Sequence, residues 1–344
     1  MINDEIIEHF KKIKQDEKKR QKLYGKVKPI IQTTAKGYKF VAVGNELFYS
    51  KKWKTFPDFL MDYLLFVFGK DWFDDELIKN NVSRHPVMQW RYSISEFQKY
   101  RNKSKNGLYN AVPSGPFKAF ITLAYDLYLL KHHSKLQENL IKRLKNVDQF
   151  QGARYELFVI TTLIRLGFNI HFEDETDIRR KHVELIAEHK TYGDKIAIEA
   201  KSKHRPGILG QPGTALNTDE IRVRLGSLVN SAISKKPGIP YFIFIDLNLP
   251  PDKMTVFNDD PQIKELFKSI MTVEVSPEGM DYFNMILYTN FPYHYGDKIE
   301  KYPEDHLSVA ISQKPLYPLK NISIIQDIQI AIKNYGQIPN QFQE

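Results

Sequence analysis

Apolar residues in the first part of the chain recur at spacings typical of one hairpin followed by helices. Residues 37–49 alternate between apolar and polar around Gly44, as a short β-hairpin would. Apolar positions three and four apart then predict helices over 56–68, 117–132 and 135–144. Residues 1–145 are therefore expected to form a mostly α-helical N-terminal domain.

From Gln149 onwards the pattern changes, and helical and strand-like runs alternate. The expected elements are a helix at 152–166, strands at 168–172, 183–188 and 195–201, a helix at 218–234, a strand at 241–246, a helix at 260–270 and a strand at 282–288. The order α, β, β, β, α, β predicts an α/β domain with a mixed sheet over residues 146–300. Residues 301–344 are expected to form a C-terminal extension with a terminal helix.

The composition favours a folded, reduced, intracellular protein. The chain has 344 residues, of which 42% are hydrophobic and 26% charged, and it contains no cysteine. The absence of cysteine excludes disulfide frameworks, thiolate zinc sites and cysteine nucleophiles. The first residues are acidic and no apolar stretch follows them, while the apolar run 59–68 is too short to span a membrane. We therefore expect a soluble, cytoplasmic protein without membrane contact.

The excess of basic residues is compatible with a polyanionic partner. Lysine and arginine outnumber the acidic residues by 50 to 41, a net charge of +9. Residues 11–28 carry one cluster of lysines, which we interpret as a solvated helix or arm in preference to a nucleic-acid arm. A second cluster, Lys201 to Arg205, directly follows a predicted strand.

Two of the predicted strands carry carboxylates that a hairpin would bring together. If residues 189–194 form the hairpin loop, Glu184 lies opposite Glu199 on the same sheet face, roughly 5 Å away at Cβ. Like charges in that position repel, and a metal cation would remove the conflict. Carboxylates and water are ligands that Mg²⁺ prefers, and Lys201 on the same face could orient an attacking water. Glu156, on the helix expected to pack against the sheet, is a further candidate.

Each of these residues also has a purely structural interpretation. Glu199 and Lys201 could form a solvated ion pair, although the context favours a catalytic role. For Glu184 the two interpretations stay equally open, and Asp177 is the alternative if the strand is misplaced. Glu156 lies on a helix face that is otherwise mostly apolar, where an unpartnered carboxylate would be costly to bury.

Taken together, Glu156 on the helix, Glu184 on one strand and Glu199-Ala-Lys201 on the next resemble the PD-(D/E)xK nucleases, which have the restriction-endonuclease-like fold. The similarity covers about residues 149–288. It implies a restriction-endonuclease-like αβββαβ core and Mg²⁺-dependent hydrolysis of phosphodiester bonds, usually in DNA, in a defence or repair context. Mn²⁺ would be expected to substitute for Mg²⁺.

The resemblance also implies roles for individual residues. Glu184, Glu199 and Glu156 would be metal ligands, and Lys201 would act at the attacking water. One feature departs from the family's pattern, because the strand acid is usually Asp, often preceded by Pro, whereas Glu184 follows His182-Val183 here.

The segment after the proposed site favours contact with nucleic acid. Lys203 and Arg205 lie in a glycine-rich stretch, residues 201–213, and are the predicted phosphate contacts. A plain surface loop is the alternative. Two other functions stay open, namely a catalytically degenerate nucleic-acid-binding protein and a structural protein that docks a partner through its aromatic surfaces. A homodimer is also possible.

Overall fold

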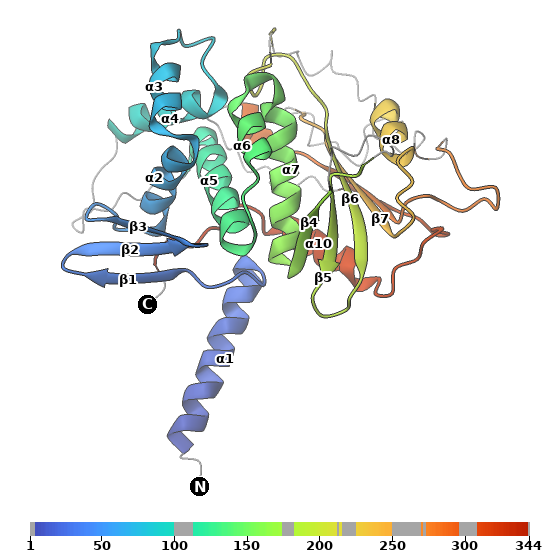
Figure 1. Ribbon diagram of the computed structural model, residues 1–344, viewed down its shortest axis with the longest axis horizontal. Helices are drawn as coiled ribbons and strands as arrows, with labels where there is room; N and C mark the ends of the chain where they lie inside the picture. Colours follow the sequence, from blue (N-terminus) through green and yellow to red (C-terminus); the bar gives the residue numbers. More distant parts are fainter. Residues whose placement is uncertain are drawn as a thin grey trace.

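The chain folds into a helical N-terminal part with a small sheet, followed by an α/β part (Figure 1). The computed structural model describes residues 4–99, 113–173, 182–211, 213–214, 225–249, 270, 273–295 and 308–342. The elements of the first part are α1 (Asp4–Tyr24), β1 (Ile31–Ala35), β2 (Tyr38–Val43), β3 (Glu46–Ser50), α2 (Phe56–Phe68), α3 (Lys70–Ile78), α4 (Pro86–Lys99), α5 (Gly115–His133) and α6 (Glu138–Lys145). The remaining elements are α7 (Val147–Arg165), β4 (Phe168–Phe172), β5 (Leu185–His189), β6 (Lys195–Ser202), α8 (Gly226–Ile233), β7 (Tyr241–Asp246), β8 (Met285–Thr289), η3 (Pro292–Tyr295), β9 (Ser308–Ile311) and α10 (Ser323–Lys333).

Within the described residues, six strands form a mixed sheet in the order β4-β5-β6-β7-β8-β9. The β4–β5, β5–β6 and β8–β9 pairs are antiparallel, whereas β6–β7 and β7–β8 are parallel. The order α7, β4, β5, β6, α8, β7 is the α, β, β, β, α, β order that the sequence predicts. Strand β9 forms the edge of the sheet, and α10 lies within the range where the sequence predicts a terminal helix.

The register of the β5–β6 hairpin is the one expected from the sequence. Glu188 pairs with Lys195 and Ile186 with Ala197. The register ends at the pair Leu185–Ile198, and beyond the strand the backbone N–H of Glu184 donates to the carbonyl of the same Ile198 at 3.1 Å. This bond holds Glu184 beside the residue that precedes Glu199, so the two carboxylates lie near one another on adjacent chain segments.

The two faces of this sheet pack against different helices. Ile196 and Ile198 of β6 belong to the large apolar core that includes α7, whereas Ala197 packs with Val229 and Ile233 of α8. Because side chains alternate along a strand, Glu199 and Lys201 lie on the α8 face and Ser202 on the α7 face. The two faces therefore offer two separate polar environments at the carboxyl end of β6.

Helices α5 to α7 stand between the two sheets (Figure 1). The large core runs without interruption from Val41 and Phe59 in the first part to Phe158 in α7 and Ile328 in α10. Helix α1 projects away from this body. The division of the chain at about residues 145 and 300 stays a prediction, since a shared core is compatible with one unit or with several tightly packed ones.

Some elements differ from the sequence expectation or extend beyond it. Strand β1 is not predicted, because its exposed polar residues break the apolar alternation. Strand β8 begins at Met285, three residues later than expected. The expected helix at 218–234 is seen as α8 within its described part, while residues 260–269 and Asp177 lie outside the described residues. Among the described helices, none combines the length and apolar character needed to cross a bilayer.

Candidate carboxylate–lysine site

Glu199 is the centre of the candidate site, and it is completely buried on the α8 face of β6. Strand β6 is held between β5 and β7, so its backbone is fixed on both sides. The apolar residues Ile196 and Ile198 anchor the opposite face of the same strand in the main core. A buried carboxylate needs a charged or hydrogen-bonding partner, and Glu199 has cationic partners in two different elements.

Lys201 lies between the two carboxylates that the sequence brings together. Its Nζ is 2.6 Å from Oε1 of Glu199 and 3.8 Å from Oε1 of Glu184. The side chain of Lys201 keeps 25% of its surface exposed and that of Glu184 keeps 18%. The site is thus open to solvent on the side of Glu184 and Lys201, while Glu199 forms its closed end.

The pKa values of Glu184 and Lys201 are both raised above their ordinary values. Burial raises the pKa of Glu184, and the negative charge of Glu199 raises it further. Burial lowers the pKa of Lys201, but the charges of Glu199 and Glu184 outweigh that effect and leave the pKa above its ordinary value. Lys201 is therefore held as an ammonium ion, whereas Glu184 is a better proton acceptor than an ordinary glutamate.

Lys235, which follows α8, is a member of the site that the sequence analysis missed. Its Nζ lies 2.7 Å from Oε1 of Glu199 and donates to Oε2 at 2.8 Å. Both ammonium groups thus converge on one buried carboxylate. The available signal was a lysine directly after the helix expected to cover this face, but the position of that helix over β6 is a tertiary property.

Glu156 does not join Glu184 and Glu199 in a three-carboxylate group. Its Oε2 accepts a hydrogen bond from Nη1 of Arg143 in α6 at 2.6 Å. Helix α7, which carries Glu156, packs on the face of the sheet opposite Glu199. Among the described residues, no three His, Cys, Asp or Glu side chains are gathered closely enough to hold a metal ion. Arg143 still links the carboxylates through its charge, because it lowers the pKa of Glu184.

Glu184 and Glu199 remain as candidate oxygen ligands for a divalent cation. Their carboxylates come from two neighbouring antiparallel chain segments. The negative charge of Glu199 contributes to the raised pKa of Glu184. Mg²⁺ is commonly bound through one or two carboxylates, with water and substrate phosphate completing its shell. A cation bound to Glu199 would have to displace Lys201 or Lys235 from that carboxylate.

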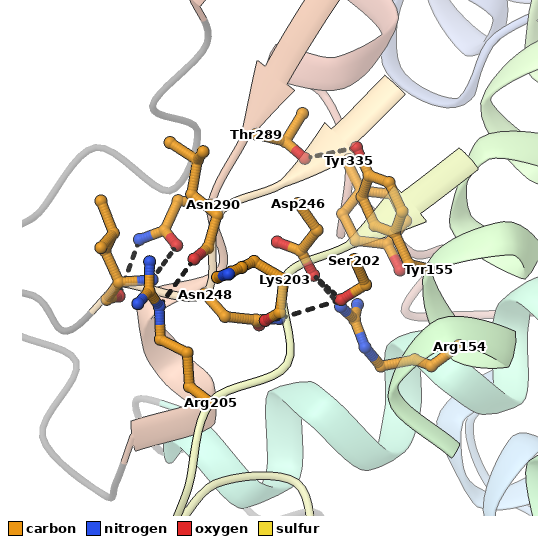
Figure 2. Close-up of polar contacts among 12 residues, drawn as sticks. Arg154, Tyr155, Ser202, Lys203, Arg205, Asp246, Asn248, Thr289, Asn290 and Tyr335 are labelled. Atoms are coloured by element: carbon orange, nitrogen blue, oxygen red, sulfur yellow. Dashed lines mark hydrogen bonds and ion pairs between the residues drawn. The ribbon is translucent and has the colours of Figure 1, made fainter. Parts of the chain in front are cut away.

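A second polar cluster lies on the other face of the sheet, at the carboxyl ends of β6, β7 and β8 (Figure 2). Asp246 is fully buried there and accepts a hydrogen bond from Nη2 of Arg154 in α7 at 2.6 Å. Its neighbours Ser202 and Thr289 come from the adjacent strands. The hydroxyl groups of Thr289 and Tyr155 are 2.8 Å apart. This cluster fastens α7 to the end of the sheet.

The two predicted phosphate contacts lie beside this second cluster (Figure 2). The backbone of Lys203 is fixed, because its N–H donates to the backbone carbonyl of Asp246 and its own carbonyl accepts from the side-chain amide of Asn248. Arg205 is only 7% exposed, and its Nε donates to the carbonyl of Leu247 at 3.0 Å. The loop after β6 is therefore anchored to the end of β7. Contact of Lys203 and Arg205 with phosphate stays a prediction.

Comparisons with known proteins provide little further information about this site. No family model and no curated protein matches the sequence. A search of solved structures finds a weak similarity to Pyrococcus furiosus SfsA in complex with Ca²⁺, with 19% identity and a TM-score of 0.22. The aligned region covers 49% of this chain and 64% of SfsA, so less than two thirds of that protein is matched. A similarity of this size carries no functional conclusion.

Proposed function

We propose that this protein is a metal-dependent nuclease of the PD-(D/E)xK type that hydrolyses phosphodiester bonds, with DNA as its substrate. The observation that carries the proposal is the position of Lys201 between two carboxylates, 2.6 Å from Glu199 and 3.8 Å from Glu184. A half-buried cation beside two acidic oxygen donors suits a phosphate group that approaches together with a divalent cation.

In this proposal Glu184 and Glu199 hold the cation. The cation would lower the pKa of a water molecule at the site and would place a positive charge beside the phosphate. The raised pKa of Lys201 keeps it protonated, so it cannot act as a general base. It would instead orient the attacking water and stabilise the negative charge that develops on the phosphate oxygens. Glu184, whose pKa is raised, is placed to accept a proton.

The remaining predicted residues would act around this centre. Glu156 is held by Arg143, and the charge of Arg143 lowers the pKa of Glu184. Glu156 would therefore act on the site indirectly, by fixing the position of Arg143. Lys203 leaves β6 directly after the site and is the proposed phosphate contact of the loop. Arg205, which is almost fully buried, would contribute mainly by holding that loop in place.

Cleavage assays on supercoiled plasmid and single-stranded DNA, with Mg²⁺, with Mn²⁺ and with EDTA, test this proposal. Glu199→Gln and Lys201→Met should each lower the cleavage rate about 100-fold or more, since each removes a charge needed in the transition state. Glu188→Gln and Lys195→Met are matched controls, because this pair occupies the other end of the same hairpin, 3.8 Å apart, and is more exposed. Cleavage that persists in EDTA, or equally in Glu199→Gln, would overturn the proposal.

One observation favours a second candidate, a nucleic-acid-binding protein that keeps the fold without cleaving. Lys201 and Lys235 together neutralise Glu199 without any metal ion. A site stabilised in this way is compatible with a purely structural ion-pair network. Binding of DNA in EDTA with no cleavage in any metal would favour this candidate over the nuclease.

A further inference from the structure

An aromatic surface lies on the outer face of the small sheet formed by β1, β2 and β3. Tyr38 and Phe40 are two residues apart on β2, and Phe40 pairs with Tyr49 of β3, so the three rings share one face. The ring centroids of Tyr38 and Tyr49 are 5.8 Å apart, as are those of Phe40 and Tyr49. Tyr49 is 63% exposed. We call these three residues the aromatic face.

The inner face of the same sheet packs against the main core. Val41 and Val43 are fully buried in the main core, and Phe48 contacts the rings of Phe59 and Tyr63 in α2. The aromatic face is therefore not needed to anchor the sheet. Large aromatic side chains on the outside of an anchored sheet mark a surface that binds something.

The charge around the aromatic face indicates what it binds. Glu46 is the single acidic residue between positions 26 and 54, and Lys131 pairs with it at 2.8 Å. The Nζ of Lys51 lies over the ring of Tyr38, 4.6 Å from its centroid. Lys36 lies in the turn between β1 and β2, and Lys52 follows Lys51 directly after β3.

We propose that the aromatic face binds an unpaired nucleic-acid strand, with bases stacked on Tyr38, Phe40 and Tyr49 and phosphates near Lys51 and Lys52. Stacking on aromatic rings beside a lysine-rich surface is the general way in which proteins hold single strands without reading sequence. A protein partner fits this surface less well, because lysine is depleted at the centres of protein interfaces. The proposal does not depend on the nuclease activity, since it concerns a different part of the chain.

Fluorescence anisotropy in EDTA tests the proposal, with fluorescein-labelled oligothymidylate, oligouridylate and a DNA duplex as probes of the full-length protein. The wild type should bind both single strands more tightly than the duplex, whose bases are already stacked. Tyr49→Ala should weaken single-strand binding about 5- to 100-fold, and Tyr49→Trp should retain it. Tyr317→Ala is the control for an exposed tyrosine elsewhere, because Tyr317 is 39% exposed and lies outside this sheet.

The lysines should act through charge alone. Lys51→Ala should lower the slope of log affinity against log salt by about 0.7, the value for one lost phosphate contact with a single strand. Unchanged melting temperatures in all variants would show that the sheet stays folded, as expected for exposed residues.

Three outcomes would overturn the proposal. The first is the absence of single-strand binding by the wild type, and the second is equal binding by Tyr49→Ala. The third is sedimentation showing a dimer that Tyr49→Ala dissociates, which would assign the face to a second copy of the chain. Glu199→Gln separates this proposal from the nuclease, because that variant should lose cleavage and keep single-strand binding.

Discussion

Nζ of Lys235 lies 2.7 Å from one carboxylate oxygen of Glu199 and donates to the other at 2.8 Å. A residue that follows α8 therefore occupies both oxygens of a fully buried acid on β6. A divalent cation that used Glu199 as a ligand would have to compete with this ammonium group. Lys235 is consequently expected to set the affinity of the site for metal.

Replacing Lys235 by methionine should strengthen metal binding. The substitution removes a positive charge next to the ligand oxygens and keeps most of the side-chain volume. We expect Mn²⁺ to bind about tenfold more tightly, a change of about 1.4 kcal/mol in binding free energy. Titration calorimetry or the electron paramagnetic resonance signal of free Mn²⁺ would measure this affinity.

Lys236→Met provides the control for that experiment. Lys236 is the next residue in the chain, but its ion-pair partner is the exposed Glu274. Its loss should leave the Mn²⁺ affinity unchanged. Equal affinities in the wild type and Lys235→Met would show that Glu199 is not a ligand.

The hairpin at the candidate site could be predicted because it depends on local rules. A loop of residues 189–194 and the two-residue period of a strand together fix which residues oppose one another. The observed pairing of Glu188 with Lys195 follows directly and brings Glu184 close to Glu199. The distance between these carboxylates and Lys201 is thus a consequence of sequence spacing.

The partners from other elements could not be predicted in the same way. Lys235 reaches Glu199 only because α8 covers that face of the sheet, and Arg143 reaches Glu156 only because α6 packs beside α7. Both contacts depend on how helices pack, which a periodic pattern does not specify. Strand β1 was missed for a different reason, because its residues Thr33 and Thr34 are polar and exposed.

The ion pair between Arg154 and Asp246 should be important for stability. Both side chains are buried, with exposures of 5% and 0%, and their polar atoms are 2.6 Å apart. Removing one member leaves the other charge buried without its partner. Arg154→Met alone should therefore lower the free energy of unfolding by about 3 to 5 kcal/mol.

A double-mutant cycle measured by urea denaturation would test this pair. The variant Arg154→Met/Asp246→Asn should be less destabilised than the sum of its two single substitutions, because it leaves no isolated charge. Strictly additive losses would show that the two side chains do not interact in solution.

Two glycines, one within α7 and one in the loop after β6, should respond oppositely to alanine. Gly152 lies inside α7, and an added Cβ there would meet no atom within 4 Å. Gly152→Ala should raise the free energy of unfolding by about 0.5 to 1 kcal/mol, since glycine is less favourable than alanine within a helix.

Gly210 is the contrasting position, in the loop after β6. Its φ is +79°, and an added Cβ would overlap Cγ2 of Val147. Gly210→Ala should therefore destabilise the fold by about 1 to 2 kcal/mol or more. Thermal unfolding monitored by circular dichroism would compare the two variants, and a loss of stability in Gly152→Ala would contradict the described helix.

Asp126 should make stability depend on pH in the mildly acidic range. Its carboxylate is buried in the main core and accepts hydrogen bonds from Tyr335 at 2.6 Å and Thr161 at 2.9 Å. Burial raises its pKa from 3.8 to about 6, although the charge of Arg165 opposes the shift. The folded state therefore holds this proton at pH values where the unfolded state has released it.

The sign of the effect follows from that difference. Because the folded state binds more protons between about pH 4 and pH 6, the contribution of Asp126 to the free energy of unfolding falls as the pH rises through this range. Above pH 6 the contribution is constant. A shift from 3.8 to about 6 corresponds to a fall of about 3 kcal/mol.

Asp126→Asn isolates this contribution, because asparagine is similar in shape and does not titrate. The wild type also contains Asp246, whose pKa burial likewise raises to about 6, so the informative quantity is the difference between the two proteins. Urea denaturation at several pH values from about 4 to 7 should show the wild type losing stability relative to Asp126→Asn as the pH rises. A difference that stays constant with pH would mean that Asp126 titrates alike in the folded and unfolded states, and hence that its carboxylate is not buried as the structure places it.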